Sequence, residues 1–311
     1  MSARAEATAS IDVVVVGGGP AGLTAATYLG RFLRSCLVID AGDSRARWIP
    51  ESNNCPGFPS GVSGVELLRR LHAQAVEFGA RFDAAEVRTI SGSADQAGGF
   101  LLDDGTRSWR ARCVILATGL ADKLPDVPWV ADAVACGAIR LCSVCDAYEA
   151  RDSCIGVYGP ARDIGAHGLF LRAYSQRVYL LPDDDTDGGE DMRAAIDAGV
   201  RVLAPGGRLE FDGERCRYAS SDGSPVVFDS IYPFLGSLTG TRFAAAAGAK
   251  LSDTGEIIVD RHQMTGVPGL FAIGDVVSGL NQISVAVGQA AIAATRAHAM
   301  LPFVPRGANG A

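Results

Sequence analysis

The feature that most constrains the fold is a glycine-rich turn between an apolar segment and a segment with a helical pattern. Apart from Asp12, residues 11–16 are all β-branched, which is typical of a strand buried on both faces. The turn over residues 17–22 reads GGGPAG, residues 23–32 follow a helical pattern, and residues 36–40 form a second apolar strand that ends in an acid. This order predicts a dinucleotide-binding unit of alternating strands and helices.

Each glycine of the turn has a physical role in such a unit. Gly17 permits the tight turn, Gly19 leaves room for a pyrophosphate, and Gly22 allows the helix to pack closely on the strand. The positive end of the helix dipole then faces the phosphates. Asp40 lies 18 residues after Gly22, near the spacing at which a carboxylate accepts a hydrogen bond from a ribose hydroxyl. This motif alone fits FAD and NAD equally well.

Charge and hydropathy exclude two classes of partner. The net charge of −7 and the pI of about 5.1 give no basic surface for nucleic acid or an anionic membrane. The most apolar stretch, residues 11–29, contains Asp12 and a cluster of glycines, and it lacks the basic start of a secretion signal. We therefore expect no nucleic-acid partner, no membrane segment and a cytoplasmic location.

Only two of the eight cysteines, Cys142 and Cys145, are closely spaced. A Cys-x-x-Cys pair can cycle between dithiol and disulfide. Zinc needs about four ligands, and the sequence has no second such pair and only scattered histidines, so we expect no metal site. A purely structural disulfide would close almost no loop and stabilise little. The other six cysteines are expected to be ordinary thiols of the core or surface.

Four further segments resemble the low-molecular-weight thioredoxin reductase family. Gly269-Leu270-Phe271-Ala272-Ile273-Gly274-Asp275 is similar to the second FAD signature of that family, in which the aspartate binds the ribityl chain. The other three segments are Ala117-Thr118-Gly119, Asn54-Cys55-Pro56-Gly57 and Asn281-Gln282-Ile283. The resemblance covers roughly residues 11 to 301.

The resemblance implies bound FAD, a homodimer and an α/β fold of two Rossmann-like, three-layer ββα domains, the second inserted in the first. The expected FAD-binding domain comprises residues 1–119 and 236–311, and the inserted domain, residues 120–235, resembles an NADPH domain and carries the cysteine pair. The residues expected to bind FAD are Gly17, Gly19, Pro20, Ala21, Gly22, Asp40, Asn54, Ala117, Thr118, Gly119, Gly274, Asp275, Gln282 and Ile283.

The segment Cys142-Ser143-Val144-Cys145-Asp146 closely resembles the Cys-x-x-Cys-Asp active site of the same family. The resemblance implies that Cys145 lies beside the flavin and that Cys142 attacks the substrate disulfide. Asp146 would be the acid–base group that protonates the departing thiolate. We also expect a helix to start at this pair. The dipole of that helix would lower the pKa of a thiol at its N-terminus.

The inserted domain departs from its family at the second glycine turn, residues 159–164. Gly159 is kept, but Ala161 replaces the glycine that lets a pyrophosphate approach. Ile164 replaces the small residue at the closest packing of helix on strand.

The first domain also departs from the family. The family's Gly-Gly-Gln-Leu contact with the flavin is absent, and Arg45 or Arg47 is a candidate for contact with the FAD pyrophosphate.

The next strand of the inserted domain also departs from the family. Where the family holds the 2′-phosphate of NADPH with two arginines, this chain has Asp183 and Asp184, followed by a third acid. Carboxylates repel a phosphate dianion. The sequence therefore predicts that NADPH is a poor electron donor, although Arg162, Arg172 and Arg177 could supply a replacement clamp.

Four functions stay open on this basis. The first is a flavin disulfide oxidoreductase that receives electrons from ferredoxin or another flavin and acts on a thioredoxin-like protein or a small disulfide or dithiol. The second is a dithiol oxidase that uses oxygen, favoured by residues 40–42 (DAG) but disfavoured by Asp146 after the second cysteine. The third is an NAD(P)H-dependent thioredoxin reductase with an atypical site. The fourth is a flavin-binding protein without catalytic activity.

Overall fold

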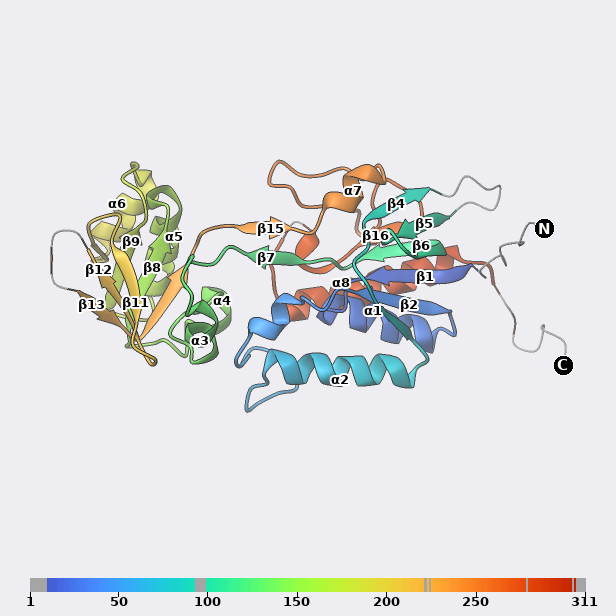
Figure 1. Ribbon diagram of the computed structural model, residues 1–311, viewed down its shortest axis with the longest axis horizontal. Helices are drawn as coiled ribbons and strands as arrows, with labels where there is room; N and C mark the ends of the chain where they lie inside the picture. The colour runs from blue at the N-terminus through green and yellow to red at the C-terminus, as the bar shows by residue number, and fades with distance from the viewer. Residues whose placement is uncertain are drawn as a thin grey trace. The chain divides into compact units, whose positions relative to one another are not determined.

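The computed structural model describes residues 10–92, 99–220, 223, 225–277, 279–303 and 305. The chain forms two compact units, each of which contains discontinuous segments (Figure 1). The first unit comprises Met1–Arg47, Val65–Ala121 and Thr239–Ala311, and the second comprises Trp48–Gly64 and Asp122–Leu238.

The elements along the first 122 residues are β1 (Ile11–Val16), α1 (Pro20–Arg31), β2 (Cys36–Asp40), η1 (Arg45–Trp48), α2 (Gly64–Glu77), β3 (Arg81–Ala84), β4 (Thr89–Gly92), β5 (Phe100–Asp103), β6 (Ser108–Leu116) and β7 (Leu120–Asp122). The middle of the chain contains α3 (Val130–Ala135), α4 (Ser143–Asp146), β8 (Cys154–Gly159), α5 (Ala161–Arg172), β9 (Arg177–Pro182), α6 (Gly189–Asp197), β10 (Arg201–Val202), β11 (Arg208–Phe211), β12 (Cys216–Ala219), β13 (Val226–Phe228) and β14 (Ser230–Pro233). The remaining elements are β15 (Ser237–Thr239), α7 (Arg242–Ala246), β16 (Leu270–Ala272), η2 (Gly274–Val276) and α8 (Ile283–Met300).

The sheet of the first unit has the strand order β3-β2-β1-β6-β5-β4, with β16 also paired to β6. Strands β3, β2, β1, β6 and β16 are parallel, whereas β4, β5 and β6 pair in an antiparallel manner. The nine-residue strand β6 serves both parts, because its first half pairs with β5 and its second half with β1 and β16. This is a parallel dinucleotide-binding sheet with a second antiparallel layer.

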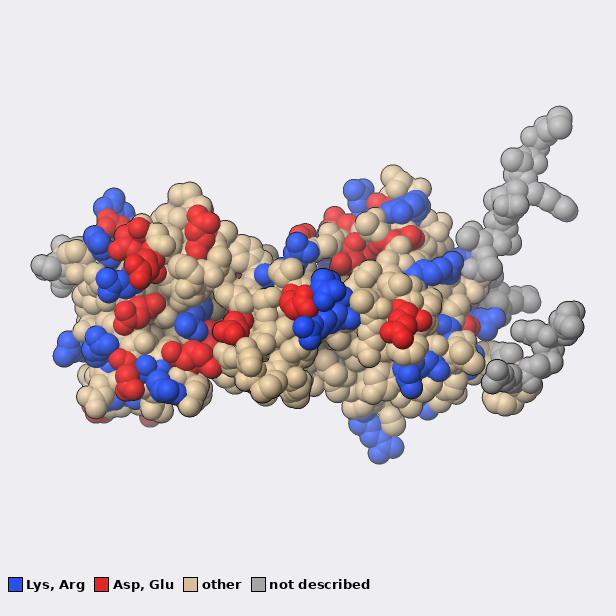
Figure 2. Space-filling view, turned by 90° about the horizontal axis from the view of Figure 1, so that it is seen from below, with Lys and Arg blue, Asp and Glu red and all other residues tan. Residues whose placement is uncertain are grey.

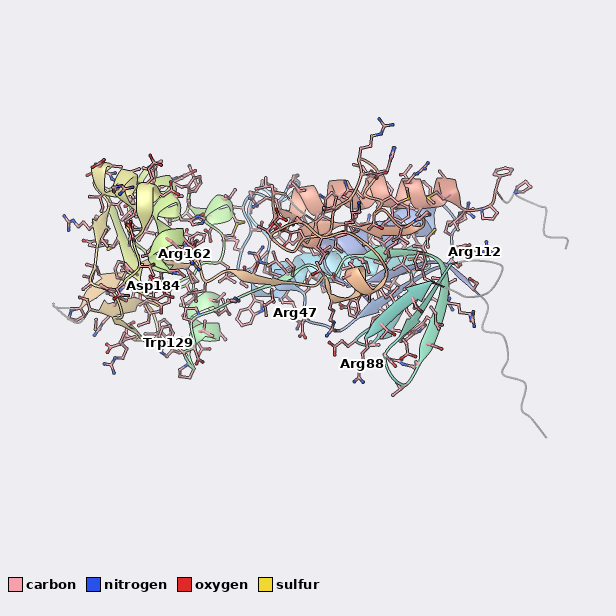
Figure 3. The ribbon with its side chains drawn as sticks, turned by 90° about the horizontal axis from the view of Figure 1, so that it is seen from above. Arg47, Arg88, Arg112, Trp129, Arg162 and Asp184 are labelled. Carbon is pink, nitrogen blue, oxygen red and sulfur yellow. A yellow bond between two sulfur atoms is a disulfide. The ribbon has the colours of Figure 1, made fainter. Side chains whose placement is uncertain are left out.

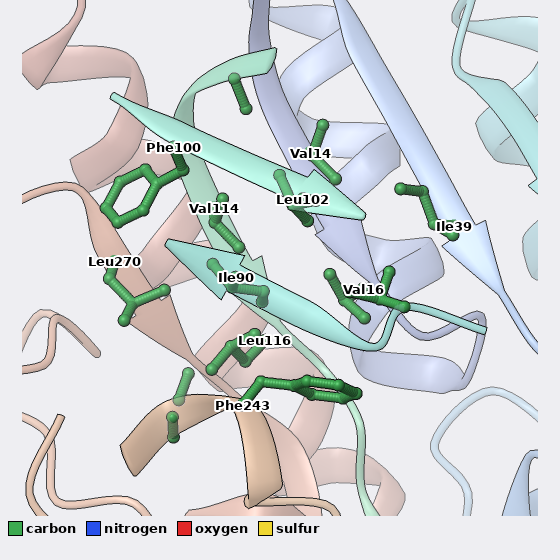
Figure 4. Close-up of a cluster of buried hydrophobic side chains, with 14 of the residues drawn as sticks. Val14, Val16, Ile39, Ile90, Phe100, Leu102, Val114, Leu116, Phe243 and Leu270 are labelled. Carbon is green, nitrogen blue, oxygen red and sulfur yellow. The ribbon is translucent and has the colours of Figure 1, made fainter. Parts of the chain in front are cut away.

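Alternate residues of β1 belong to two separate cores, as expected for a strand covered on both faces. Val13 and Val15 pack with the apolar faces of α1 and α8. Val14 and Val16 pack with β4, β5 and Phe243 of α7 (Figure 4). The predicted burial of residues 11–16 on both faces is therefore confirmed, and it fixes the position of the turn that follows them.

The second unit repeats this plan with fewer strands. Its parallel sheet has the order β10-β9-β8-β14, and β11, β12 and β13 form a separate antiparallel sheet. Helices α5 and α6 pack with β8 and β9 in one apolar core, and α3 packs with β11 to β13 in another. Both sheets with their helices confirm the predicted α/β class with two Rossmann-like units.

Strands β7 and β15 pair with each other and form a two-stranded sheet where the chain passes between the units. On the face drawn in Figure 2, acidic and basic side chains are interspersed over both units. Within the described residues, no helix is long and apolar enough to cross a membrane.

Candidate active site

The first glycine turn has the geometry that a dinucleotide requires. Gly17 has a φ of +109°, and a Cβ there would lie 2.3 Å from the carbonyl oxygen of Ala117. A Cβ at Gly22 would lie 2.0 Å from the carbonyl oxygen of Gly17, so α1 starts in close contact with the turn. A Cβ at Gly19 would meet only the Ser44 hydroxyl, at 3.3 Å. The turn is therefore closed toward the protein and open on the side of Gly19.

Asp40 lies at the carboxyl end of β2 and faces the same turn. Its Oδ1 accepts a hydrogen bond of 2.9 Å from the amide of Gly18. A cavity of about 510 Å³ opens beside this carboxylate. The residues that line it include Gly18, Asp40, Gly42, Ser44, His72 and Phe82. A carboxylate at the wall of a cavity, next to a helix N-terminus, suits the ribose and phosphates of an adenosine nucleotide.

Ala117, Thr118 and Gly119 follow β6 directly and lie against this turn. The carbonyl of Ala117 is the group that a side chain at Gly17 would strike. The Thr118 hydroxyl donates a 2.6 Å hydrogen bond to the carbonyl of Gly240, and the amide of Gly240 donates to the carbonyl of Gly119. These three residues thus join the turn to the segment on which the chain returns to the first unit.

Gly274 and Asp275 form the short helix η2 after β16. The amide of Gly274 donates a 2.7 Å hydrogen bond to Gln289 on α8, and Asp275 forms a 3.3 Å ion pair with Arg45. Both side chains of the ion pair are mostly buried, at 24% and 20% exposed. Arg45 thus joins the candidate site, where it could neutralise a pyrophosphate.

Gln282 caps the N-terminus of α8, and Ile283 is its first residue. Asn54, the remaining residue expected at the flavin, belongs to the second unit, where its side-chain oxygen accepts a hydrogen bond from Ser52. Apart from Asn54, the structure places every residue expected to bind FAD in the first unit. The open face of Gly19, the cavity beside Asp40 and the carboxylate of Asp275 fit FAD.

Cys142 and Cys145 form a disulfide in the second unit, with their Cα atoms 5.3 Å apart. Helix α4 begins at Ser143, immediately after Cys142, as the sequence predicts. It contains only four residues, so few aligned peptide dipoles act on the pair and the expected dipole effect is small. Val144 and Tyr148 beside the disulfide are 55% and 65% exposed, so this segment presents apolar groups at its surface.

Asp146 is held by two side chains that the sequence analysis missed. Its Oδ1 accepts a 2.8 Å hydrogen bond from the Tyr232 hydroxyl, and its Oδ2 forms a 3.1 Å ion pair with Arg140. Burial raises the pKa of Asp146 above its usual range, although Arg140 and Tyr232 act in the opposite direction. A raised pKa makes this carboxyl group a stronger base, which suits proton exchange with a thiol of the neighbouring cysteine pair.

The second glycine turn has the same order of elements as the first but different packing. Gly159 has a φ of +153°, and a Cβ there would lie 2.5 Å from the carbonyl oxygen of Phe234. Ala161 is 3% exposed and is the first residue of α5. Ile164, at the position of Gly22 in the first turn, is fully buried in the core of the second unit. This turn therefore lacks the open glycine face of the first.

The carboxylate of Asp184 lies on the N-terminus of α5. Its Oδ1 accepts hydrogen bonds from the amide of Ala161 at 3.1 Å and from the Thr186 hydroxyl at 2.8 Å. These bonds lower the pKa of Asp184, so it is ionised at neutral pH. Asp183 directly precedes Asp184 in the chain. Figure 3 labels the side chains of Asp184 and Arg162. A negative charge thus stands where a dinucleotide phosphate would accept its hydrogen bond.

Comparison with known proteins agrees with this geometry. The sequence profile of the "Pyridine nucleotide-disulphide oxidoreductase" family matches residues 11–159 and 179–290. Two Rossmann-like units with parallel sheets, one of which carries a Cys-x-x-Cys disulfide, are typical of flavin-linked disulfide oxidoreductases. The chain belongs to the pyridine nucleotide-disulphide oxidoreductase family.

Individual relatives place the chain more closely. It is 29% identical over 306 residues to a thioredoxin reductase of Treponema pallidum, covering 94% of this chain and 97% of that protein. A thioredoxin reductase of Mycoplasmopsis pulmonis is 26% identical, with 91% and 94% covered. Among solved structures, that of HlmI has a TM-score of 0.85 at 28% identity, with 94% of this chain and 92% of HlmI covered. An oxidoreductase from Agrobacterium tumefaciens has a TM-score of 0.79 at 26% identity, with 93% and 98% covered.

These findings confirm the predicted resemblance and the predicted cofactor. The protein is an FAD-dependent disulfide oxidoreductase of thioredoxin reductase type. Its electron donor and its substrate are separate questions, which depend on the second unit.

Proposed function

We propose that the protein passes electrons between FAD and the Cys142–Cys145 disulfide, and from there to a disulfide substrate. Cys145 is the cysteine beside the flavin, Cys142 exchanges with the substrate, and Asp146 is the acid–base group. The disulfide between the two cysteines and the raised pKa of Asp146 support these roles.

The first unit holds the FAD in this proposal. The proposed FAD-binding domain comprises residues 1–119 and 236–311, and the proposed inserted domain comprises residues 120–235, although Trp48–Gly64 belongs to the second compact unit. Bound FAD supplies the two-electron chemistry, while the chain supplies a helix N-terminus for the pyrophosphate and carboxylates for the hydroxyl groups. Asp40 suits the ribose, Asp275 suits the ribityl chain, and Arg45 suits the pyrophosphate.

The donor is a reductant other than NADPH, such as ferredoxin or another flavin. The observation that supports this is the hydrogen bond from the amide of Ala161 to Asp184. The carboxylate uses the helix amide that a phosphate would need, and its charge repels a phosphate. Asp183 and Asp163 are further acids nearby: burial and the charges of Asp184 and Asp163 raise the pKa of Asp183. A 2′-phosphate would meet acids where the related reductases have arginines.

The partner on the substrate side is a thioredoxin-like protein or a small disulfide or dithiol. Thioredoxin reductases among the relatives favour the protein partner. The exposed Val144 and Tyr148 beside the disulfide offer apolar contact to either kind. We further propose a cytoplasmic homodimer, by analogy with the family.

A dithiol oxidase is the second candidate, and the same closed site favours it. If no nicotinamide reduces the flavin, a dithiol substrate can supply the electrons through Cys142 and Cys145, with oxygen as the final acceptor. The substrate dithiol is then oxidised to a disulfide, and oxygen is reduced to hydrogen peroxide. The two candidates differ in the direction of electron flow.

Anaerobic mixing separates these functions. The purified flavoprotein is mixed in a stopped-flow instrument with millimolar NADPH, NADH or dithiothreitol, and the flavin absorbance is followed. We expect slow bleaching with NADPH and fast bleaching with the dithiol. Admission of air then tests oxidase activity, since an oxidase regains its absorbance and produces peroxide at a catalytic rate. Full reduction within milliseconds that saturates at micromolar NADPH would contradict the donor proposal.

A further inference from the structure

The two oxygens of Asp146 face donors of different kinds. Oδ1 faces the Tyr232 hydroxyl, at 2.8 Å, and Oδ2 faces the Arg140 guanidinium, at 3.1 Å. A guanidinium can only donate, so it always favours the ionised carboxylate. A hydroxyl can donate to a carboxylate and can also accept from a protonated carboxyl group. Only Oδ1 therefore has a neighbour that suits both protonation states.

Strand β14 positions both donors, because Tyr232 is part of the strand and Arg140 is hydrogen-bonded to it. Tyr232 is fully buried in the core of the second unit, and Ser230, two residues earlier on the same face, is 3% exposed. The Ser230 hydroxyl accepts a 2.9 Å hydrogen bond from Nε of Arg140. The amide of Arg140 donates to the carbonyl of Ile231 at 2.9 Å. The strand thus orients the carboxyl group of Asp146 at two points.

Three charged or titratable side chains act on Asp146 among the described residues. Arg140 lies before the cysteine pair, Tyr232 lies on β14, and Glu149 follows α4. Arg140 and Tyr232 favour the carboxylate, whereas burial and Glu149 favour the protonated form. The balance of these opposing effects sets the pH at which Asp146 exchanges its proton.

We propose that Tyr232 and Arg140 are positioning residues that direct the transferable proton of Asp146 to Oδ1 and set its proton affinity. When two electrons enter the disulfide, the S–S bond breaks and leaves two thiolates. One thiolate takes the proton from Oδ1 of Asp146, whose carboxylate is then held by Arg140 and Tyr232. The reverse step returns that proton when the dithiol is oxidised. This inference rests on the proposed acid–base role of Asp146.

The test measures the titration of one carboxyl group in the FAD-loaded protein. Protein labelled with ¹³C at the aspartate carboxyl carbons is titrated by NMR, and the Asp146 signal is assigned by its loss in Asp146→Asn. Tyr232→Phe removes one hydroxyl and keeps the ring. Because the lost hydrogen bond favours the carboxylate, we expect the midpoint to rise by about one pH unit. Arg140→Gln is expected to raise it by at least as much.

Tyr148→Phe is the matched control, since its exposed ring lies against Arg151 rather than in the core. An unchanged midpoint in Tyr232→Phe, or an equal shift in Tyr148→Phe, would overturn the proposal. If Tyr232→Phe does not fold, Arg140→Gln decides, and an unchanged midpoint there overturns it.

A separate measurement distinguishes this result from a failure of the proposed function. Free thiols are counted in the unaltered protein before and after treatment with dithiothreitol. If no additional thiols appear at Cys142 and Cys145, the redox function fails, whatever the Asp146 titration shows. If they appear, the pH dependence of their alkylation by iodoacetamide should shift in Tyr232→Phe in the same direction as the carboxyl titration.

Discussion

The two glycine turns of this chain follow the same order of strand, turn, helix and strand, yet they differ in what their surroundings leave open. In the first, a Cβ at Gly22 would lie 2.0 Å from the carbonyl oxygen of Gly17, whereas a Cβ at Gly19 would meet only the Ser44 hydroxyl, at 3.3 Å. In the second, Ile164 and Ala161 fill the matching positions. We expect the first turn to accept a phosphate against the backbone and the second to need rearrangement before it could do so.

The second turn keeps its fold because its close contacts are at other residues. A Cβ at Gly165 would lie 2.5 Å from the amide nitrogen of Met192 on α6, and one at Gly168 would lie 2.5 Å from the side chain of Leu180. Helix α5 thus has its close contacts at Gly165 and Gly168, one and four residues after Ile164. The packing of α5 on the sheet of the second unit therefore does not depend on a glycine at residue 164.

The comparison leaves the second unit with redox chemistry as its proposed role, and the largest expected effects are at the cysteines. Cys142→Ser should leave Cys145 as a lone thiolate against oxidised flavin, with a broad absorbance band at long wavelength. Cys145→Ser should abolish that band. Both variants should lose all disulfide turnover, measured with dithiothreitol as reductant. Equal spectra in the two variants, or a band in Cys145→Ser alone, would contradict the assigned roles.

A swap of residues between the turns tests the packing difference. Gly22→Ile introduces the residue found at 164, and its Cβ would meet the carbonyl of Gly17 at 2.0 Å. We expect the free energy of unfolding to fall by about 3 kcal/mol or more, with loss of FAD. Urea unfolding and the ratio of flavin to protein absorbance measure both effects.

The matched control is Gly288→Ala on α8, where a Cβ would have no heavy atom within 4 Å. This change should stabilise the protein by up to about 1 kcal/mol, because alanine favours a helix over glycine. A yellow Gly22→Ile protein with an unchanged unfolding midpoint would remove the basis of the comparison.

Asp184→Asn tests the charge at the second turn. The variant keeps an oxygen for the amide of Ala161 but removes the negative charge. We expect the dissociation constant for NADPH to fall about tenfold. Nucleotide fluorescence titration measures it. Asp185→Asn removes an exposed neighbouring charge and should change the constant by less than about twofold. Equal effects of the two variants would show that the contact with α5 is not specific.

The last test concerns a buried thiol outside both sites. Burial raises the pKa of Cys36 on β2 to about 12. Because the unfolded thiol ionises near pH 9 and the folded one does not, its contribution is complete below pH 9 and decreases as pH rises toward 12. By pH 10 the lost contribution of Cys36 to the free energy of unfolding amounts to about 1.4 kcal/mol. The stability of Cys36→Ala, measured by urea unfolding at pH 8 and 10, should therefore fall less than that of the unaltered protein. An identical decrease in stability for both proteins would contradict the raised pKa of Cys36.

Much of the first unit could be predicted because its signals are local. The predicted strands at residues 11–16 and 36–40 coincide with β1 and β2, where continuous apolar runs are unambiguous. The predicted helix, residues 23–32, starts three residues later than α1, because glycine and proline in a first turn hide the helical pattern. The disulfide partners could also be predicted, since the two cysteines are only three residues apart.

The rest depended on contacts between distant residues. The sequence showed acids at residues 183–185, but only the folded chain shows that Asp184 turns toward α5. Tyr232 and Asp146 are 86 residues apart, and no periodicity links a strand residue to a carboxylate so far away. Polar pairs of this kind follow from which strands become neighbours, and a single sequence does not specify that at the level of side chains.

The pairing of β7 with β15 brings the two ends of the inserted segment together, which bears on how that segment could be deleted. At the border of the first unit, the amide of Gly240 donates a 2.9 Å hydrogen bond to the carbonyl of Gly119. The two ends of the intervening segment therefore leave from adjacent points, so a gene that encodes residue 119 joined to residue 240 through a short glycine linker would lose the insertion without stretching the remaining backbone. A different domain could be inserted into the proposed flavin-binding unit at the same junction between residues 119 and 240.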